Sequence, residues 1–439
     1  MERKGYLWFF LGLGSRLQVV ASLSITEIIV LAAAPFIFFK NYERMKHDGI
    51  MPFFWLSLGV VIGCIIASIS NNTHPQGVLR GLAVTCIISC SIIFSHWILR
   101  QDPMGFKWYI LAIPLSALIS TFVFKTEMEM ATHGLSSEEI MSGSTYWITR
   151  LKPLVLAPTE GWYLQMPMLV NVLAPVLMAV FSILSSVSGR SAALTSLSFA
   201  MMVIIGGKTS TSMSRISRHF GWLCVLGLVF VGCVYWGYKT AASTGLLGEA
   251  ARMKYERQTH GGQGGIGRLL LGGRGDSFIG LLACRDKPIV GWGPWAIDKN
   301  GYTEEFLEKY GTQEDIETLY KSMWLQSYNS GTNMRLISCH AYVTEFWCWY
   351  GIMGLIFWVY VIFTYLRYLR QDVAVVPNWF GWLACSIPGM FWGIFFSPLT
   401  DRFGIPLVVV ACLMARAVRK GWWHLPEEMV HEIQKAELK

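Results

Sequence analysis

The chain has 439 residues, of which 53% are hydrophobic and only 15% are charged, and its mean hydropathy is +0.44. These values exclude an ordinary water-soluble globular protein, and several apolar runs have the length of about 20 residues that crosses a bilayer. The net charge of +8 does not require a nucleic acid, since cytoplasmic Lys and Arg facing anionic lipid account for it. The sequence predicts an all-α polytopic membrane protein.

In chain order, the apolar runs predict about 11 membrane spans, or about 12 if a weak crossing lies within Lys125–Pro158. The expected spans are Tyr6–Ala21, Ser24–Phe39, Pro52–Ser70, Gly77–Leu99, Phe106–Phe124, Trp162–Ser186, Arg190–Gly206, His219–Tyr238, Ala341–Leu366, Trp379–Ser397 and Phe403–Ala415.

The short loops predict the orientation of these spans, because loops rich in Lys and Arg stay in the cytoplasm. Clusters such as Arg44–Lys46 and Arg416–Lys420 are expected there. The loop Asn71–Gln76 has neither residue and is expected outside, and counting back from the C-terminus places Lys239–His340 outside as well.

Lys107 and Lys208 are both expected in the cytoplasm, which requires an even number of spans between them. The apolar runs predict three spans there. Either a further crossing lies within Lys125–Pro158, or the segment that contains Pro167 and Pro175 enters and leaves the membrane on one side.

This pattern predicts four parts, which are N-terminal transmembrane helices (1–238), an external loop domain (239–340), C-terminal transmembrane helices (341–420) and a cytoplasmic tail (421–439). Within the loop, Thr303–Tyr328 has acidic residues and helical apolar spacing, which predicts a helix on the membrane surface. Cys284 and Cys339 are the only cysteines of this loop, and they either pair in an oxidising compartment or are two unrelated thiols.

Three basic residues are candidates for chemistry. His340 ends the external loop just before a span, where an imidazole can transfer a proton at neutral pH. Arg190 lies at a break between apolar spans and Arg274 lies in a Gly-rich part of the loop, and an arginine offers a fixed fork of donors to phosphate. The alternatives are a structural histidine, an interfacial anchor and a solvated loop charge, respectively.

Three further residues flank these candidates. Glu345 follows His340 and is expected to hold it or to contact a substrate, or else to make a polar contact between helices. Asp276 and Arg335 are expected in supporting roles beside Arg274 and His340. The sequence has no H-E-x-x-H, no G-x-S-x-G and no Walker-type loop, and it predicts no metal and no cofactor.

Two motifs together resemble the O-antigen ligase and O-antigen polymerase family. The first is R-G-D-S-F-I-G-L-L-A-C-R-D-K-P-I-V-G-W-G-P, Arg274–Pro294, and the second is H-x10-G-x2-G, formed by His340, Gly351 and Gly354. S-x-S-G-R-S (186–191) and the opening segment Gly14–Glu27 are also similar to that family.

The chain departs from the family pattern at three positions. Ala341 follows the histidine where Asn or Ser is frequent, and Thr344 replaces a frequent Leu. Trp295 follows the P-x-x-G-x-G-P turn where Gly is usual.

The resemblance implies a GT-C-like membrane glycosyltransferase of the bacterial inner membrane, with its active site and large loop in the periplasm. It implies that a glycan moves from undecaprenyl pyrophosphate to a sugar hydroxyl of a lipid-linked glycan or the lipid A core, with inversion. Arg190 and Arg274 would hold the pyrophosphate, and His340 would take the acceptor's proton. Neither a nucleotide sugar nor a nucleic acid takes part.

The residues do not separate a polymerase from a ligase, and base rates favour the polymerase slightly. A transporter or flippase of lipid-linked sugars is the alternative from another class, although such proteins usually contain structural repeats. A membrane acyltransferase with His340 as base is a third option, which the expected orientation disfavours.

Overall fold

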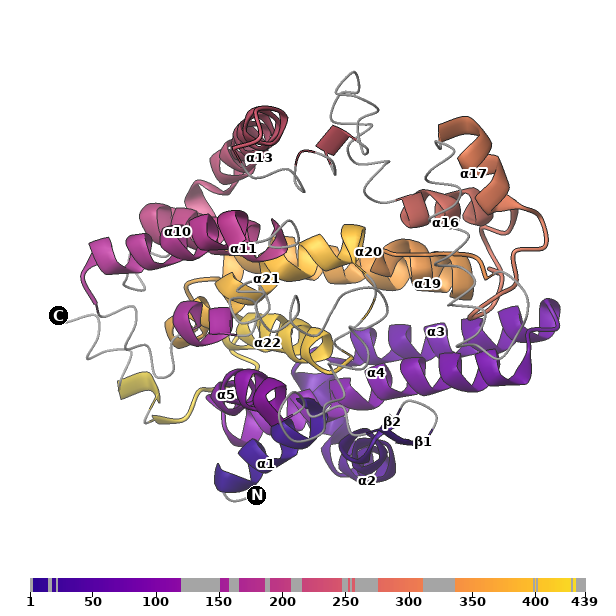
Figure 1. Ribbon diagram of the computed structural model, residues 1–439. Helices are drawn as coiled ribbons and strands as arrows, with labels where there is room; N and C mark the ends of the chain where they lie inside the picture. Colours follow the sequence, from indigo (N-terminus) through magenta and orange to yellow (C-terminus); the bar gives the residue numbers. More distant parts are fainter. Residues whose placement is uncertain are drawn as a thin grey trace.

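The computed structural model describes residues 3–14, 18–20, 23–119, 151–157, 166–185, 190–206, 215–246, 252, 255–256, 275–310, 336–397, 399, 402–427 and 429–431. These residues form a helical fold with one small hairpin, in which β1 (Gln18–Val20) pairs antiparallel with β2 (Leu23–Ser24) (Figure 1).

Four helical segments of the described residues are long and apolar enough to cross a membrane. They are α3 (Met51–Ser70), α4 (Pro75–Gln101), α20 (Ile352–Arg367) with a π-helical turn to Asp372, and α21 (Phe380–Phe396) with the preceding turn Pro377–Trp379. One face of α3 exposes Ile62, Ile66 and Ile69, as expected where a helix meets lipid. These observations support an all-α membrane protein, while the full number of spans stays a prediction.

The remaining helices are shorter or less apolar. They are α1 (Arg3–Gly14), α2 (Ile25–His47), α5 (Phe106–Leu118), α10 (Met168–Ser185), α11 (Arg190–Gly206), α13 (Phe220–Ser243), α16 (Gly275–Asp286), α17 (Tyr302–Tyr310), α19 (Tyr342–Tyr350) and α22 (Gly404–Arg419).

The first two expected spans need correction. The helix of Tyr6–Ala21 ends at Gly14 and is followed by the hairpin rather than by further membrane-crossing helix. The second helix continues past Phe39 to His47, and a capping box fixes its start. In that box the Glu27 N–H donates to Ser24 Oγ at 3.2 Å, and the Ser24 N–H donates to Glu27 Oε2 at 2.8 Å.

The expected span Ala341–Leu366 is also wrong as a single helix, because it breaks at Gly351 into α19 and α20. Gly351 has φ +63°, and a Cβ there would lie 2.0 Å from the Ile289 carbonyl oxygen. The Ile289 backbone therefore occupies the space that a continuous helix with a side chain would need, and that carbonyl accepts the Ile352 N–H at 2.9 Å.

Large aromatic side chains fill the core between α3, α4, α20, α21 and α22. Trp382 is stacked on Phe106 with 4.3 Å between ring centroids, and the buried Trp379 Nε1 donates to the Pro103 carbonyl at 2.9 Å. In Figure 1, α16 and α17 lie beside α19 at one end of the bundle, and α10 and α11 lie along α21. The expected surface helix Thr303–Tyr328 is described as helix at Tyr302–Tyr310, and 311–335 lie outside the described residues.

Candidate functional site

His340 meets a carboxylate at the start of α16. Its Nδ1 lies 3.2 Å from Asp276 Oδ2, and Ser338 Oγ donates to the other oxygen, Oδ1, at 2.8 Å. The side chains of His340 and Asp276 are 37% and 29% exposed, so the pair is open to solvent without being fully hydrated. A histidine whose Nδ1 is held in this way presents Nε2 to a ligand, and Nε2 has no hydrogen bond within the described part of the chain.

Small residues bring the two halves of this pair together. A Cβ on Gly280 of α16 would lie 2.8 Å from Cys339 Sγ, so only glycine lets the helix approach the segment that carries His340. The same segment is tied to the chain after α16, because Leu336 forms a β-bridge with Ile297 and the Ile337 N–H donates to the Ala296 carbonyl at 2.8 Å.

The two motifs of the sequence resemblance contact each other. The turn Pro288–Pro294 packs against the break between α19 and α20, where Gly351 lies. Three backbone hydrogen bonds join them: Trp292 N–H to the Cys348 carbonyl (2.6 Å), Gly293 N–H to the Trp349 carbonyl (3.1 Å) and Ile352 N–H to the Ile289 carbonyl (2.9 Å). These hydrogen bonds hold the turn in a fixed position against the ends of α19 and α20.

Glu345 is buried in α19 and does not hold His340, whose carboxylate partner is Asp276. Its Oε2 accepts the Leu399 N–H at 3.5 Å. α19 is not among the four helical segments long and apolar enough to cross a membrane. Burial raises the pKa of Glu345 to about 8, although the Leu399 N–H and the nearby Arg402 act in the opposite direction. Arg402 itself pairs with Glu27 at 3.5 Å.

The side chains of Arg190, Arg274 and Arg335 lie outside the described residues, so their distances to His340 and Asp276 are not defined. Arg190 is the first residue of α11, and its side chain lies outside the described residues. Arg274 directly precedes α16, and Arg274 and Arg335 both lie outside the described residues.

Cys284 and Cys339, whose pairing the sequence leaves open, are both free thiols in this structure. Hydrogen bonds with Cys284 and Cys339, together with burial, raise the pKa of the Cys348 thiol. Within the described residues, no group of three or more His, Cys, Asp or Glu side chains is arranged to hold a metal ion.

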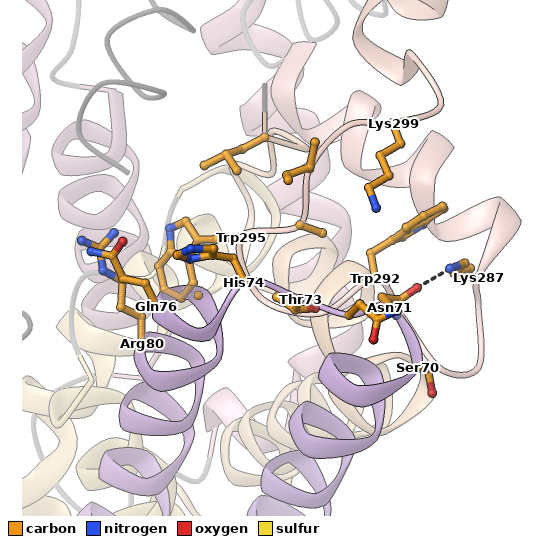
Figure 2. Close-up of a pocket in the computed structure, with 15 residues that line it drawn as sticks. Ser70, Asn71, Thr73, His74, Gln76, Arg80, Lys287, Trp292, Trp295 and Lys299 are labelled. Atoms are coloured by element: carbon orange, nitrogen blue, oxygen red, sulfur yellow. Dashed lines mark hydrogen bonds between the residues drawn. The ribbon is translucent and has the colours of Figure 1, made fainter. Parts of the chain in front are cut away.

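Sequence reasoning missed a pocket (Figure 2), whose lining includes Leu336, four residues before His340 in the chain. It has a volume of about 250 Å³ and lies between the α3–α4 loop and the chain that follows α16. Asn71 fixes its base, because Asn71 Nδ2 donates to the Gly291 carbonyl at 3.0 Å and Asn71 Oδ1 accepts from Lys287 Nζ. The segments expected on one side of the membrane, Asn71–Gln76 and the long loop, therefore lie at the same end of the bundle.

One signal in the sequence pointed toward the pocket. Trp295, the departure from the family's usual Gly, is one of its lining residues. No family model, no curated protein and no solved structure matches this chain.

Proposed function

We propose that this protein is a membrane glycosyltransferase that moves a glycan from undecaprenyl pyrophosphate to a sugar hydroxyl at the periplasmic face of the bacterial inner membrane, with inversion and without a metal. The observation that carries the proposal is the pair formed by His340 and Asp276, with 3.2 Å between Nδ1 and Oδ2. It supplies a general base at the end of the bundle where the two motifs of the resemblance contact each other.

The chemistry needs little more than a base and charge stabilisation. The acceptor's hydroxyl oxygen bonds to the anomeric carbon while the bond from that carbon to the pyrophosphate oxygen breaks. The hydroxyl proton passes to His340 Nε2, and Asp276 stabilises the imidazolium that forms. Undecaprenyl pyrophosphate leaves with the bonding electrons, and pyrophosphate is already a good leaving group.

Arg190 and Arg274 are proposed to neutralise the charge of the pyrophosphate, as the resemblance implies. Arg274 directly precedes α16, which carries Asp276 in its first turn, so the sequence alone keeps these two residues close. A guanidinium suits this task because its fork of donors binds two phosphate oxygens at once.

A reconstituted reaction tests the proposal. The purified full chain is given a synthetic undecaprenyl-pyrophosphate oligosaccharide in EDTA, with no nucleotide sugar, and the products are separated on gels and weighed by mass spectrometry. A ladder of products identifies a polymerase, and a single transfer that requires lipid A core identifies a ligase. Donor lipid that binds, or crosses the bilayer of a vesicle, while no product forms with either acceptor would refute the proposal in favour of the transporter.

The His340→Ala variant tests the role of the histidine in that assay, and Glu305→Gln is its control. His340→Ala is expected to abolish transfer while the protein still inserts into the membrane, because His340 lies at the surface of the site rather than in the core. Glu305→Gln, which alters an exposed ion pair with Arg285, is expected to leave transfer unchanged.

A further inference from the structure

The pocket between the α3–α4 loop and the chain that follows α16 is positively charged. Arg80, Lys287 and Lys299 line it together with His74, and none of the described residues that line it is Asp or Glu. The nearest carboxylates along the chain are engaged elsewhere. Asp298 accepts from the backbone of Tyr302 and Thr303 at the start of α17, and Asp286 accepts from the Tyr302 hydroxyl at 2.6 Å.

The lysines keep their charge available to a ligand. Lys287 Nζ contacts a neutral amide, Asn71 Oδ1, and lies 3.9 Å from the centroid of the Trp292 ring. Neither Lys287 nor Lys299 forms an ion pair with another described residue. The pocket also receives the N-terminus of α4, where no side chain caps the helix, and the helix dipole adds positive potential.

Trp295 occupies this pocket in a strained conformation. Its φ is +52°, a region that bulky side chains rarely adopt. Residues held in such conformations by their surroundings cluster at ligand sites and active sites. The indole lies against Trp349, with ring centroids 4.4 Å apart, and is only half-buried, so part of it is open to the pocket.

Two glycines of α4 let Pro294 and Trp295 pack closely against this helix. Gly77 and Gly81 lie on one face of α4, one helical turn apart. A Cβ on Gly81 would lie 2.3 Å from Pro294 Cγ, and one on Gly77 would lie 2.9 Å from the Pro294 carbonyl oxygen. Pro294 and the indole of Trp295 are thereby held at a fixed place beside α4.

Figure 2 shows two groups of side chains around the pocket. Trp295, His74, Gln76 and Arg80 lie on one side, and Trp292, Lys287, Lys299 and Asn71 lie on the other, with Thr73 between them. The Trp292 side chain is part of the packed core, because it is buried and its Nε1 donates to the Ala283 carbonyl at 2.8 Å. Trp295 is therefore the indole available to a ligand.

From these contacts we infer that the pocket is a binding site for an acidic saccharide. The apolar C–H face of one sugar ring lies on Trp295, with its carboxylate toward Arg80 on the same side of the pocket. The acidic substituent of a second sugar unit lies toward Lys287 and Lys299 on the opposite side. The volume of about 250 Å³ falls below the range of about 300–1,000 Å³ that accommodates drug-sized ligands, and so suits one or two sugar units. A free phosphate group would need the cations but not an indole held at the cost of backbone strain.

The site has a place in the proposed reaction. Leu336 lines the pocket, and Ser338 and His340 follow it along the same short segment. If the glycosyltransferase function holds, the pocket selects an acidic sugar of the donor or acceptor glycan next to the reacting hydroxyl. This role in selection rests on the proposed function, whereas saccharide binding itself rests only on the pocket.

The test is a binding measurement that needs no turnover. The full chain in nanodiscs of phosphatidylcholine is titrated by calorimetry with trigalacturonic acid, with its neutral methyl ester and with inorganic pyrophosphate. The acid is expected to bind roughly tenfold tighter than the ester at low salt, and the difference is expected to shrink as salt is added. Equal binding of acid and ester, or pyrophosphate binding with no binding of the acid, would overturn the inference.

Two variants locate the site. Trp295→Gly is expected to weaken binding of the acid roughly tenfold. Glycine adopts positive φ without strain, which offsets part of the packing against Trp349 that is lost with the indole. Lys299→Gln is expected to weaken binding of the acid but not of the ester. Lys420→Gln is the matched control, since Lys420 also lies near an indole, 5.7 Å from the Trp422 centroid, but at the end of α22.

The outcomes separate this inference from the proposed function. A wild-type protein that transfers glycan but does not bind the acid refutes the saccharide pocket alone. One that binds the acid through Trp295 but transfers nothing refutes the proposed function alone. Unchanged binding in Trp295→Gly would exclude the indole as the sugar platform.

Discussion

Gly291 and Gly351 contact each other so closely that a Cβ on Gly291 would lie 2.5 Å from the backbone nitrogen of Gly351. Both have positive φ, +79° and +63°. The contact joins the turn after α16 to the break between α19 and α20, and it thereby connects the segment that follows α16 to the helix bundle.

Gly351→Ala is expected to be strongly destabilising. Its Cβ would overlap the Ile289 carbonyl, and the positive φ alone costs on the order of 1–3 kcal/mol. The measurement is thermal unfolding of the detergent-solubilised protein. Gly227→Ala in α13 is the matched control, because nothing lies within 4 Å of its Cβ position and alanine favours helix by about 1 kcal/mol. A Gly351→Ala protein as stable as wild type would contradict the tight contact.

Asp276→Asn is expected to lower the rate of glycan transfer by about 10²-fold or more while the fold is retained. The amide keeps the shape of the carboxylate but cannot stabilise an imidazolium at His340. The effect should fall on kcat more than on KM, and circular dichroism should be unchanged. Ser338→Ala is expected to cost less, because Ser338 only orients Asp276. An increase in KM with kcat unchanged would indicate a binding role instead.

Glu345→Gln tests the protonation of a buried carboxyl. Because the pKa is raised from 4.5 to about 8, the folded state binds the proton more tightly than the unfolded state does. The stability that this carboxyl contributes is therefore present below about pH 4.5 and is lost as pH rises toward 8. The Gln variant should match wild type near pH 5 and become the more stable protein by pH 8, as measured by its unfolding temperature. A constant difference across that range would show that Glu345 is ionised throughout.

Asp48→Ala is expected to destabilise the opposite end of the bundle by about 3–5 kcal/mol, because it leaves buried partners uncompensated. Asp48 Oδ2 lies 2.8 Å from His96 Nε2 and also pairs with Arg100. Burial alone would raise the pKa of Asp48, but the hydrogen bonds and charges of His96 and Arg100 lower it overall. Unfolding in denaturant, with the exposed Glu305→Gln as control, measures the loss.

The sequence predicted the helical class, because apolar runs near the length of a bilayer leave few other structures. Pro52–Ser70 and Gly77–Leu99 correspond to α3 and α4 within a few residues. The expectation for Ala341–Leu366 was wrong for a tertiary reason. Hydropathy does not register the Ile289 backbone that occupies the space beside Gly351.

The candidate site was predicted in part. His340 and Asp276 were both singled out, but their pairing was not, and Glu345 was expected in the place that Asp276 holds. Asp276 and His340 are brought together by the close approach of Gly280 to Cys339, by the hydrogen bond from Ser338 to Asp276 and by the bridge between Ile297 and Leu336. Contacts of this range depend on how a long loop folds back, which no local pattern encodes.

The sequence by itself determined a helical chain with apolar segments long enough to cross a membrane, and it singled out His340. Burial of apolar side chains in lipid follows from composition and period alone. Only the tertiary structure decided which carboxylate meets His340, and that Arg80 and Lys299, which are far apart in the chain, line one pocket with Trp295. Electrostatic and stacking contacts act over a few ångströms in space, so their partners are fixed by packing rather than by order along the chain.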